Sequence, residues 1–118
     1  MIPIYRAKKI DSNEYVEGFL KNCTDTGLDI FWIQSKQFID YQIDTNTLSI
    51  NFPNMIDSQG NKIFASLQEE GKGGDIIETE LKRVCTVKYK EYFFYADNKD
   101  YHCNCFGFIH SKTIGIQQ

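Results

Sequence analysis

Residues 84–90 read Val84-Cys85-Thr86-Val87-Lys88-Tyr89-Lys90, an alternation that is typical of a half-buried β-strand. Successive side chains of a strand point to opposite faces, so we expect Cys85, Val87 and Tyr89 to face a core. Four consecutive aromatic residues follow at positions 92–95. No helical period is found from residue 81 to residue 118, which predicts that this part of the chain is β-structure.

The sequence N-terminal to this strand repeats the same pattern of short β-type runs separated by turn residues. Residues 2–10 and 15–20 predict one hairpin, and residues 28–33 predict a buried strand. A second hairpin is expected from residues 38–43 and 48–52 around a turn at 44–47, with Ser49 and Asn51 facing outward. The predicted fold class is therefore mostly β, with short antiparallel strands and little helix.

A glycine-rich segment interrupts this pattern at residues 65–74. Gly71, Gly73 and Gly74 rule out a stable helix there, so we predict a surface loop that is more mobile than its flanks. Asp75 places a negative charge where a phosphate-binding loop would hold its anion, which argues against phosphate binding. We expect Gly74 to bend the chain and Asp75 to bond the local backbone before Ile76 or Ile77 enters the core.

Composition limits the classes of function. A chain of 118 residues with 42% hydrophobic and 14% aromatic residues fits one folded domain. The net charge of −3 argues against binding of DNA or RNA through bulk positive charge. A local basic stripe remains an alternative, and it would consist of Lys82, Arg83, Lys88 and Lys90.

The cysteines and the hydropathy pattern point to a cytoplasmic location. The N-terminal residues lack the apolar region of an export signal, and no apolar run is long enough to cross a membrane. We therefore expect no membrane association, and we expect Cys23, Cys85, Cys103 and Cys105 to be reduced and packed as small hydrophobic residues.

One cluster could carry chemistry, because His102, Cys103, Cys105 and His110 supply four metal-ligand side chains within nine residues. Structural zinc sites use two to four residues between paired cysteines, and only Asn104 separates these two. We predict no zinc, no cofactor and no enzymatic activity, since no nucleophile, base and orienting group can be named together.

Several short motifs resemble the YopX family of phage and prophage proteins. The segment from Asp57 to Phe64 (DSQGNKIF), followed by Gly74-Asp75-Ile76-Ile77, is similar to the family's turn and strand entry. Residues 5–8 and 15–18 resemble its opening hairpin, and residues 114–115 its closing strand. The chain departs from the family pattern by inserting residues 65–73 between the aromatic residue and the Gly-Asp pair.

The resemblance implies one domain over residues 1–118 that contains a small SH3-like barrel. We expect an N-terminal β lobe at about residues 1–53 and the barrel lobe at about residues 54–118. The resemblance also implies an origin in a phage or prophage, and it supplies no catalytic residues.

The leading functional hypothesis is a non-enzymatic accessory protein that acts through protein contacts and self-association. Its partner would be a second copy of the chain or a phage or host protein. Two of four consecutive aromatic residues on a strand must face away from the core, which predicts a partner surface at Tyr92, Phe93, Phe94 and Tyr95. The alternative is a nucleic-acid-associated factor in phage replication or recombination, in which these aromatic residues stack on bases.

Overall fold

The computed structural model describes residues 2–25, 28–91, 93–103 and 108–118, and it confirms the mostly β prediction. Within these residues the helical element is a 3₁₀ turn, η1, at Phe108–His110. No helix of the described residues has the length and apolar character needed to cross a membrane. The strands are β1 Ile4–Lys9, β2 Tyr15–Asp25, β3 Leu28–Gln34, β4 Asp40–Asn51, β5 Ala65–Ser66, β6 Asp75–Glu78, β7 Val84–Lys90, β8 Phe93–Asn98, β9 Tyr101–Cys103 and β10 Lys112–Ile116.

The first four strands close into a small antiparallel barrel, which we call the ring. β2 pairs with β1 and β3, and β4 pairs with β3 and β1, so each of the four strands has two neighbours within the ring. The ring spans residues 4–51, whereas the sequence analysis expected a barrel at about residues 54–118. Its interior holds Ala7, Val16, Ile33, Ile43 and Leu48.

One long strand makes this closure possible, and here the predicted hairpin at residues 38–52 is wrong. The turn-type residues 44–47 form a bulge in β4: Thr47 donates a hydrogen bond to the Asp44 carbonyl oxygen and accepts one from the Lys8 amide. Arg6 pairs with Ser49 and Lys8 pairs with Asp44, so four residues of β4 lie opposite the single Ala7. Such a bulge bends a strand and increases its twist, which lets β4 reach both β3 and β1.

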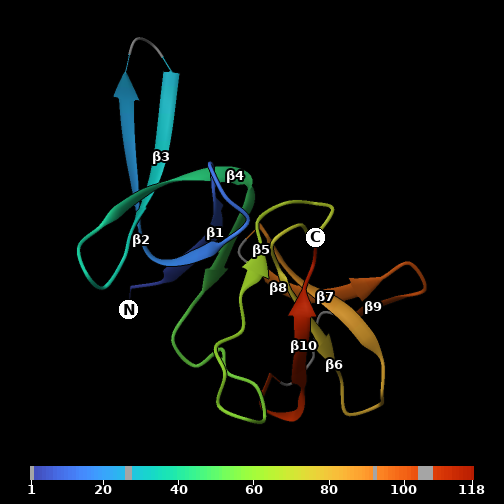
Figure 1. The fold of residues 1–118 in the computed structure, drawn as a ribbon. Helices are drawn as coiled ribbons and strands as arrows, with labels where there is room; N and C mark the ends of the chain where they lie inside the picture. Colours follow the sequence, from blue (N-terminus) through green and yellow to red (C-terminus); the bar gives the residue numbers. More distant parts are fainter. Residues whose placement is uncertain (1, 26–27, 92, 104–107) are drawn as a thin grey trace.

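The remaining strands form a second body beside the ring (Figure 1). The sheet continues from β4 through β5, β7 and β6 to β10, while β8 and β9 extend it from the other edge of β7. Cys85 and Val87 are buried there, as the alternation predicted. This core contains Ile50, Met55, Ile63, Ala65, Ile77, Cys85, Val87 and Ala96.

The second half of β4 lies between the two bodies and is covered on both faces. Ser49 and Asn51 were predicted to face outward, but both are buried. Ser49 Oγ donates to the Arg6 carbonyl oxygen at 3.2 Å. Asn51 Nδ2 donates to the carbonyl oxygens of Met55 and Ile63 at 2.9 and 2.7 Å. These small polar side chains satisfy backbone groups where a third layer of chain packs on the strand.

The glycine-rich segment is packed at its backbone and exposed at its tip: Ala65, Ser66, Gly71, Gly73 and Gly74 are buried, whereas Glu69, Glu70 and Lys72 are exposed, as expected of a surface loop. Ala65 and Ser66 form β5 and are fully buried. Ser66 Oγ donates to the Lys72 carbonyl oxygen at 2.7 Å, and the Gly73 amide donates to the Gln117 carbonyl oxygen at 2.8 Å. The absence of a side chain on Gly73 lets its backbone lie against the backbone of Thr47, since a Cβ atom on Gly73 would overlap the Thr47 carbonyl oxygen.

A buried ion pair joins the two bodies at this point. Arg6 of β1 donates from Nη2 to Asp75 Oδ1 at 2.8 Å and to the Gly73 carbonyl oxygen at 2.9 Å. Asp75 Oδ2 accepts a hydrogen bond from the Phe64 amide at 2.8 Å, so Asp75 bonds backbone eleven residues away rather than the local backbone that the sequence analysis expected. The Phe64 ring lies 4.4 Å from the Arg6 guanidinium carbon.

The electrostatics of this pair reflect two opposing effects. Burial raises the pKa of Asp75, while the Arg6 guanidinium and the Phe64 amide act in the opposite direction by stabilising the carboxylate. Both side chains are almost completely excluded from water. Each charge therefore depends on the other to offset its loss of hydration.

A second carboxyl group, Asp57, fixes the C-terminal strand to the turn at residues 57–61. Its Oδ1 accepts the amides of Gln59 and Asn61 at 2.9 Å, and its Oδ2 accepts the amide of Thr113 at the start of β10 at 3.1 Å. Gly60 has a φ of 82°, as the predicted tight turn requires. Burial alone would raise the pKa of Asp57, but the bonds from Asn61, Gln59 and Thr113 outweigh it and lower the pKa to about 2.

We predict that Gly73→Ala destabilises the fold much more than Gly60→Ala. Both glycines have a positive φ, 84° and 82°, so an alanine strains the backbone at either position by about 1–2 kcal/mol. At Gly73 the added Cβ atom would collide with the Thr47 backbone, whereas at Gly60 no atom lies within 4 Å of the added Cβ. Urea unfolding should show an additional loss of about 2 kcal/mol for Gly73→Ala. Equal losses for the two variants would contradict the packed position of residues 71–74.

We also predict an acid-sensitive contribution from Asp57. The folded-state pKa of about 2 is below the ordinary value of 3.8, so ionised Asp57 stabilises the fold at neutral pH. That contribution, about 1–2 kcal/mol, is lost as the pH falls from about 4 to about 2. The stability difference between wild type and Asp57→Asn should therefore shrink over this interval. A stability difference for Asp57→Asn that stays constant over this interval would refute the assignment.

Candidate partner-binding surface

The predicted partner surface lies on the face of β7, β8 and β9 that points away from the core. Since Cys85 and Val87 of β7 face the core, Thr86, Lys88 and Lys90 point to the opposite face of the sheet, where Thr86 is also buried. Antiparallel pairing places Lys88 opposite Tyr95, Lys90 opposite Phe93 and Asp97 opposite His102. Residues directly opposite one another share a face. We call this surface the outer sheet face, and it is defined by Lys88, Lys90, Phe93, Tyr95, Asp97 and His102.

Two of these side chains, Lys88 and His102, approach Asp97. Lys88 Nζ lies 2.8 Å from Asp97 Oδ1, and both side chains are mostly shielded from solvent. His102 Nδ1 lies 3.9 Å from Asp97 Oδ2. The His102 ring also packs against the Tyr95 ring, with 5.1 Å between the ring centroids. The ion pair and the ring contact thus lie next to each other at the centre of the outer sheet face.

Two hollows flank the Lys88–Asp97 pair. The smaller one has a volume of about 540 Å³ and extends toward Ile76, Asn98 and Gln117. The larger one has a volume of about 880 Å³ and joins the outer sheet face to the glycine-rich segment through Glu69. Its lining residues are Glu69, Lys88, Lys90, Glu91, Phe93, Tyr95, Asp97 and His102. The larger hollow thus combines aromatic rings with charges of both signs.

The four aromatic residues of the prediction have different positions. Phe93 faces outward with 72% of its surface exposed. Phe94 turns inward, and its ring lies 4.6 Å from the Tyr89 ring and 5.6 Å from the Phe52 ring. Tyr95 faces outward against His102, and Tyr92 is outside the described residues. The structure therefore brings Phe93 and Tyr95 to one hollow and assigns Phe94 to the core, while their role in binding stays a prediction.

The basic stripe considered in the sequence analysis is not a continuous row of available cations. Lys82 lies 3.7 Å from Glu78, and the Arg83 guanidinium covers the Tyr101 ring at 4.0 Å. Both residues precede β7, at the opposite end from Lys90. Lys88 forms an ion pair with Asp97. Lys82, Arg83 and Lys88 thus belong to three separate local contacts, whereas Lys90 lines the larger hollow.

The outer sheet face also contains the arrangement closest to a catalytic one, namely His102 beside Asp97. Their separation of 3.9 Å exceeds hydrogen-bond length, and the carboxylate already contacts Lys88. The residues that line the larger hollow include no serine, threonine or cysteine among those the structure describes. The side chains of Cys103 and Cys105 are outside the described residues, and His110 is exposed at the end of η1. In the part of the chain that is described, no three histidine, cysteine or acidic side chains gather to hold a metal.

The sequence analysis missed the pairing of Lys88 with Asp97 and the participation of Glu69. Alternation in β7 placed Lys88 on the outward face, but its partner depends on the register between β7 and β8. Glu69 reaches the hollow because residues 65–74 pack against β7, which the glycine content did not suggest. No protein-family model matches this sequence, and no match is found among curated proteins.

Proposed function

We propose that this protein is a non-enzymatic binding protein whose outer sheet face holds a segment of another protein. The observation that carries the proposal is Phe93, a large apolar side chain 72% exposed at the rim of a hollow of about 880 Å³. Aromatic residues at the edge of a concave surface are the common anchors of protein interfaces. An apolar side chain of the partner would fill the hollow between Phe93 and Tyr95.

The charges around this anchor favour a protein partner of mixed charge. Lys88 and Asp97 neutralise each other at the centre, while Lys90, Glu91 and Glu69 line the same hollow. A peptide with an apolar residue flanked by one acidic and one basic residue finds a complementary charge on each side. Such complementarity fixes the orientation of a bound segment.

Nucleic-acid binding is the alternative, and one observation favours it: Lys90 lies opposite Phe93 on the neighbouring strand, so a cation stands beside an exposed ring. Stacking aromatics flanked by lysines are used for single-stranded nucleic acid. Against this, affinity for a polyanion needs cations free to displace counterions, and Glu69, Glu91 and Asp97 share the hollow. We therefore prefer the protein partner.

The cellular setting of the proposal rests on the YopX resemblance of residues 57–64 and 74–77. It supports an accessory protein of a phage or prophage that acts in the bacterial cytoplasm without catalysis.

The test is selection of short random peptides on the immobilised protein, followed by calorimetry of the selected sequences. We predict that the selected peptides carry an apolar residue between opposite charges, and that Phe93→Ser weakens their binding about tenfold or more. Phe38→Ser is the matched control, because it removes an equally exposed phenylalanine from a different part of the chain.

Circular dichroism should show that both variants keep the fold. Equal affinity of the wild type and Phe93→Ser for the selected peptides would refute the proposed site. Binding of a short single-stranded oligonucleotide that weakens steeply with salt and depends on Phe93 would instead assign the surface to nucleic acid.

A further inference from the structure

A second apolar surface lies on the exterior of the ring, where β2, β3 and β4 pair. Phe19 of β2 is 53% exposed, and Phe38 and Ile39, in the connection between β3 and β4, are 81% and 48% exposed. Strand pairing places Phe19 opposite Gln34, and Gln34 opposite Asp40, so these positions share the outward face. We call this surface the ring patch, and it consists of Phe19, Lys21, Phe38, Ile39 and Asp40.

The backbone holds Phe38 outward in a strained conformation. Its φ is 62°, a left-handed value that is unfavourable for a bulky side chain. The Phe38 amide donates to the Ser35 carbonyl oxygen at 3.0 Å, and the Ser35 amide donates to the Ile39 carbonyl oxygen at 2.9 Å. A short turn therefore enforces a conformation that exposes an aromatic ring. Strain of this kind is retained where a residue serves a contact rather than the fold.

The charges of the ring patch indicate which partner fits it. Lys21 Nζ lies 3.0 Å from Asp40 Oδ2, and both side chains are exposed. The patch therefore carries one cation and one anion side by side and has no net charge, which disfavours a polyanion or an acidic membrane surface. When the patch meets a copy of itself around a two-fold axis that passes between Lys21 and Asp40, each Lys21 faces the other chain's Asp40.

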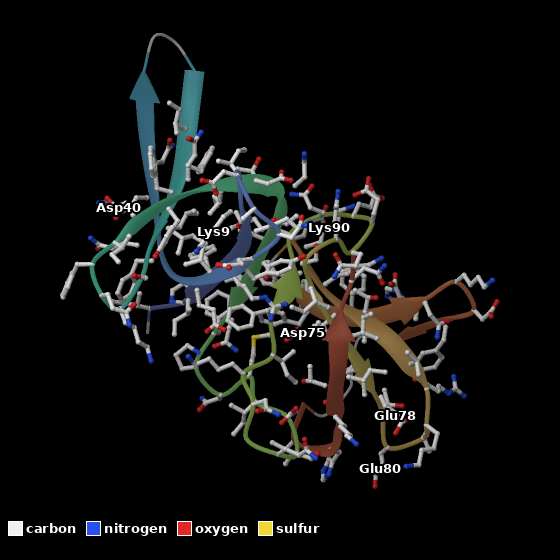
Figure 2. The ribbon with its side chains drawn as sticks, in the orientation of Figure 1. Lys9, Asp40, Asp75, Glu78, Glu80 and Lys90 are labelled. Carbon is white, nitrogen blue, oxygen red and sulfur yellow. The ribbon has the colours of Figure 1, made fainter. Side chains whose placement is uncertain are left out.

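We propose that the ring patch is the interface of a two-fold symmetric homodimer. The three apolar side chains form its centre, and the Lys21 and Asp40 pairs of the two chains bridge its border. The patch is on the outer side of the ring, and Figure 2 shows Asp40 there, away from the buried Asp75. The dimer therefore leaves the outer sheet face of each chain available, so the proposal stands independently of the proposed function.

The first test uses Phe38→Gly and sedimentation equilibrium over a range of concentrations. Glycine accepts the positive φ, so the variant should raise the thermal midpoint of unfolding measured where the wild type is monomeric. Loss of the ring should at the same time weaken self-association about tenfold or more. These opposite effects separate a lost interface from a damaged fold. Phe93→Ser, on the outer sheet face, is the control and should leave association unchanged.

The second test uses the charge reversals Lys21→Asp and Asp40→Lys. Each variant alone places like charges across a two-fold interface and should be mostly monomeric. An equimolar mixture of the two should form a heterodimer, because both contacts across the axis are then between opposite charges. A wild type that stays monomeric at every concentration, a mixture that does not associate, or an association that requires Phe93 and not Phe38 would overturn the proposal.

Discussion

The structure depends on one buried contact between distant parts of the chain, the ion pair of Arg6 and Asp75. Arg6 belongs to the first strand of the ring, and Asp75 begins β6 of the second body. Transfer of either charge out of water costs several kcal/mol, and the pair offsets this cost only while both partners are in place. The Gly73 carbonyl oxygen and the Phe64 amide add one hydrogen bond to each partner, so the pair also positions the segments on either side of β5.

The packing around this ion pair also determines where residues 65–74 and Glu69 lie. Gly73 contacts the Thr47 backbone so closely that a side chain does not fit, and this brings residues 65–74 against β4 and β7. With the backbone of this segment held against β4 and β7, the exposed Glu69 borders the outer sheet face and lines the larger hollow. The candidate binding surface is therefore shaped partly by the same packing that joins the two bodies. The ring patch is independent of it, because it forms on the far side of the ring.

Local patterns in the sequence were sufficient to predict some structural elements and not others. The alternation of residues 84–90 correctly placed Cys85 and Val87 in the core. The same rule predicted that two of the four consecutive aromatic residues face outward, but it did not say which two. The continuous β4 was missed because the turn-type residues 44–47 use their side chains to stabilise a bulge. The packed glycine segment was missed because its partners, Arg6 and Thr47, are remote in sequence. The Lys88–Asp97 pair and the ring patch depend on strand register, which composition and alternation do not determine.

The most direct test of this account is a double-mutant cycle with Arg6→Met and Asp75→Asn, measured by urea unfolding. The single tryptophan, Trp32, lies in β3 of the ring, so its fluorescence reports whether a change at Asp75 in the second body destabilises the ring. The account predicts that each single variant loses about 3–5 kcal/mol. It also predicts that the double variant loses less than the sum by about 2 kcal/mol or more. Losses that add to within about 0.5 kcal/mol, or a Trp32 transition unchanged by Asp75→Asn, would contradict it.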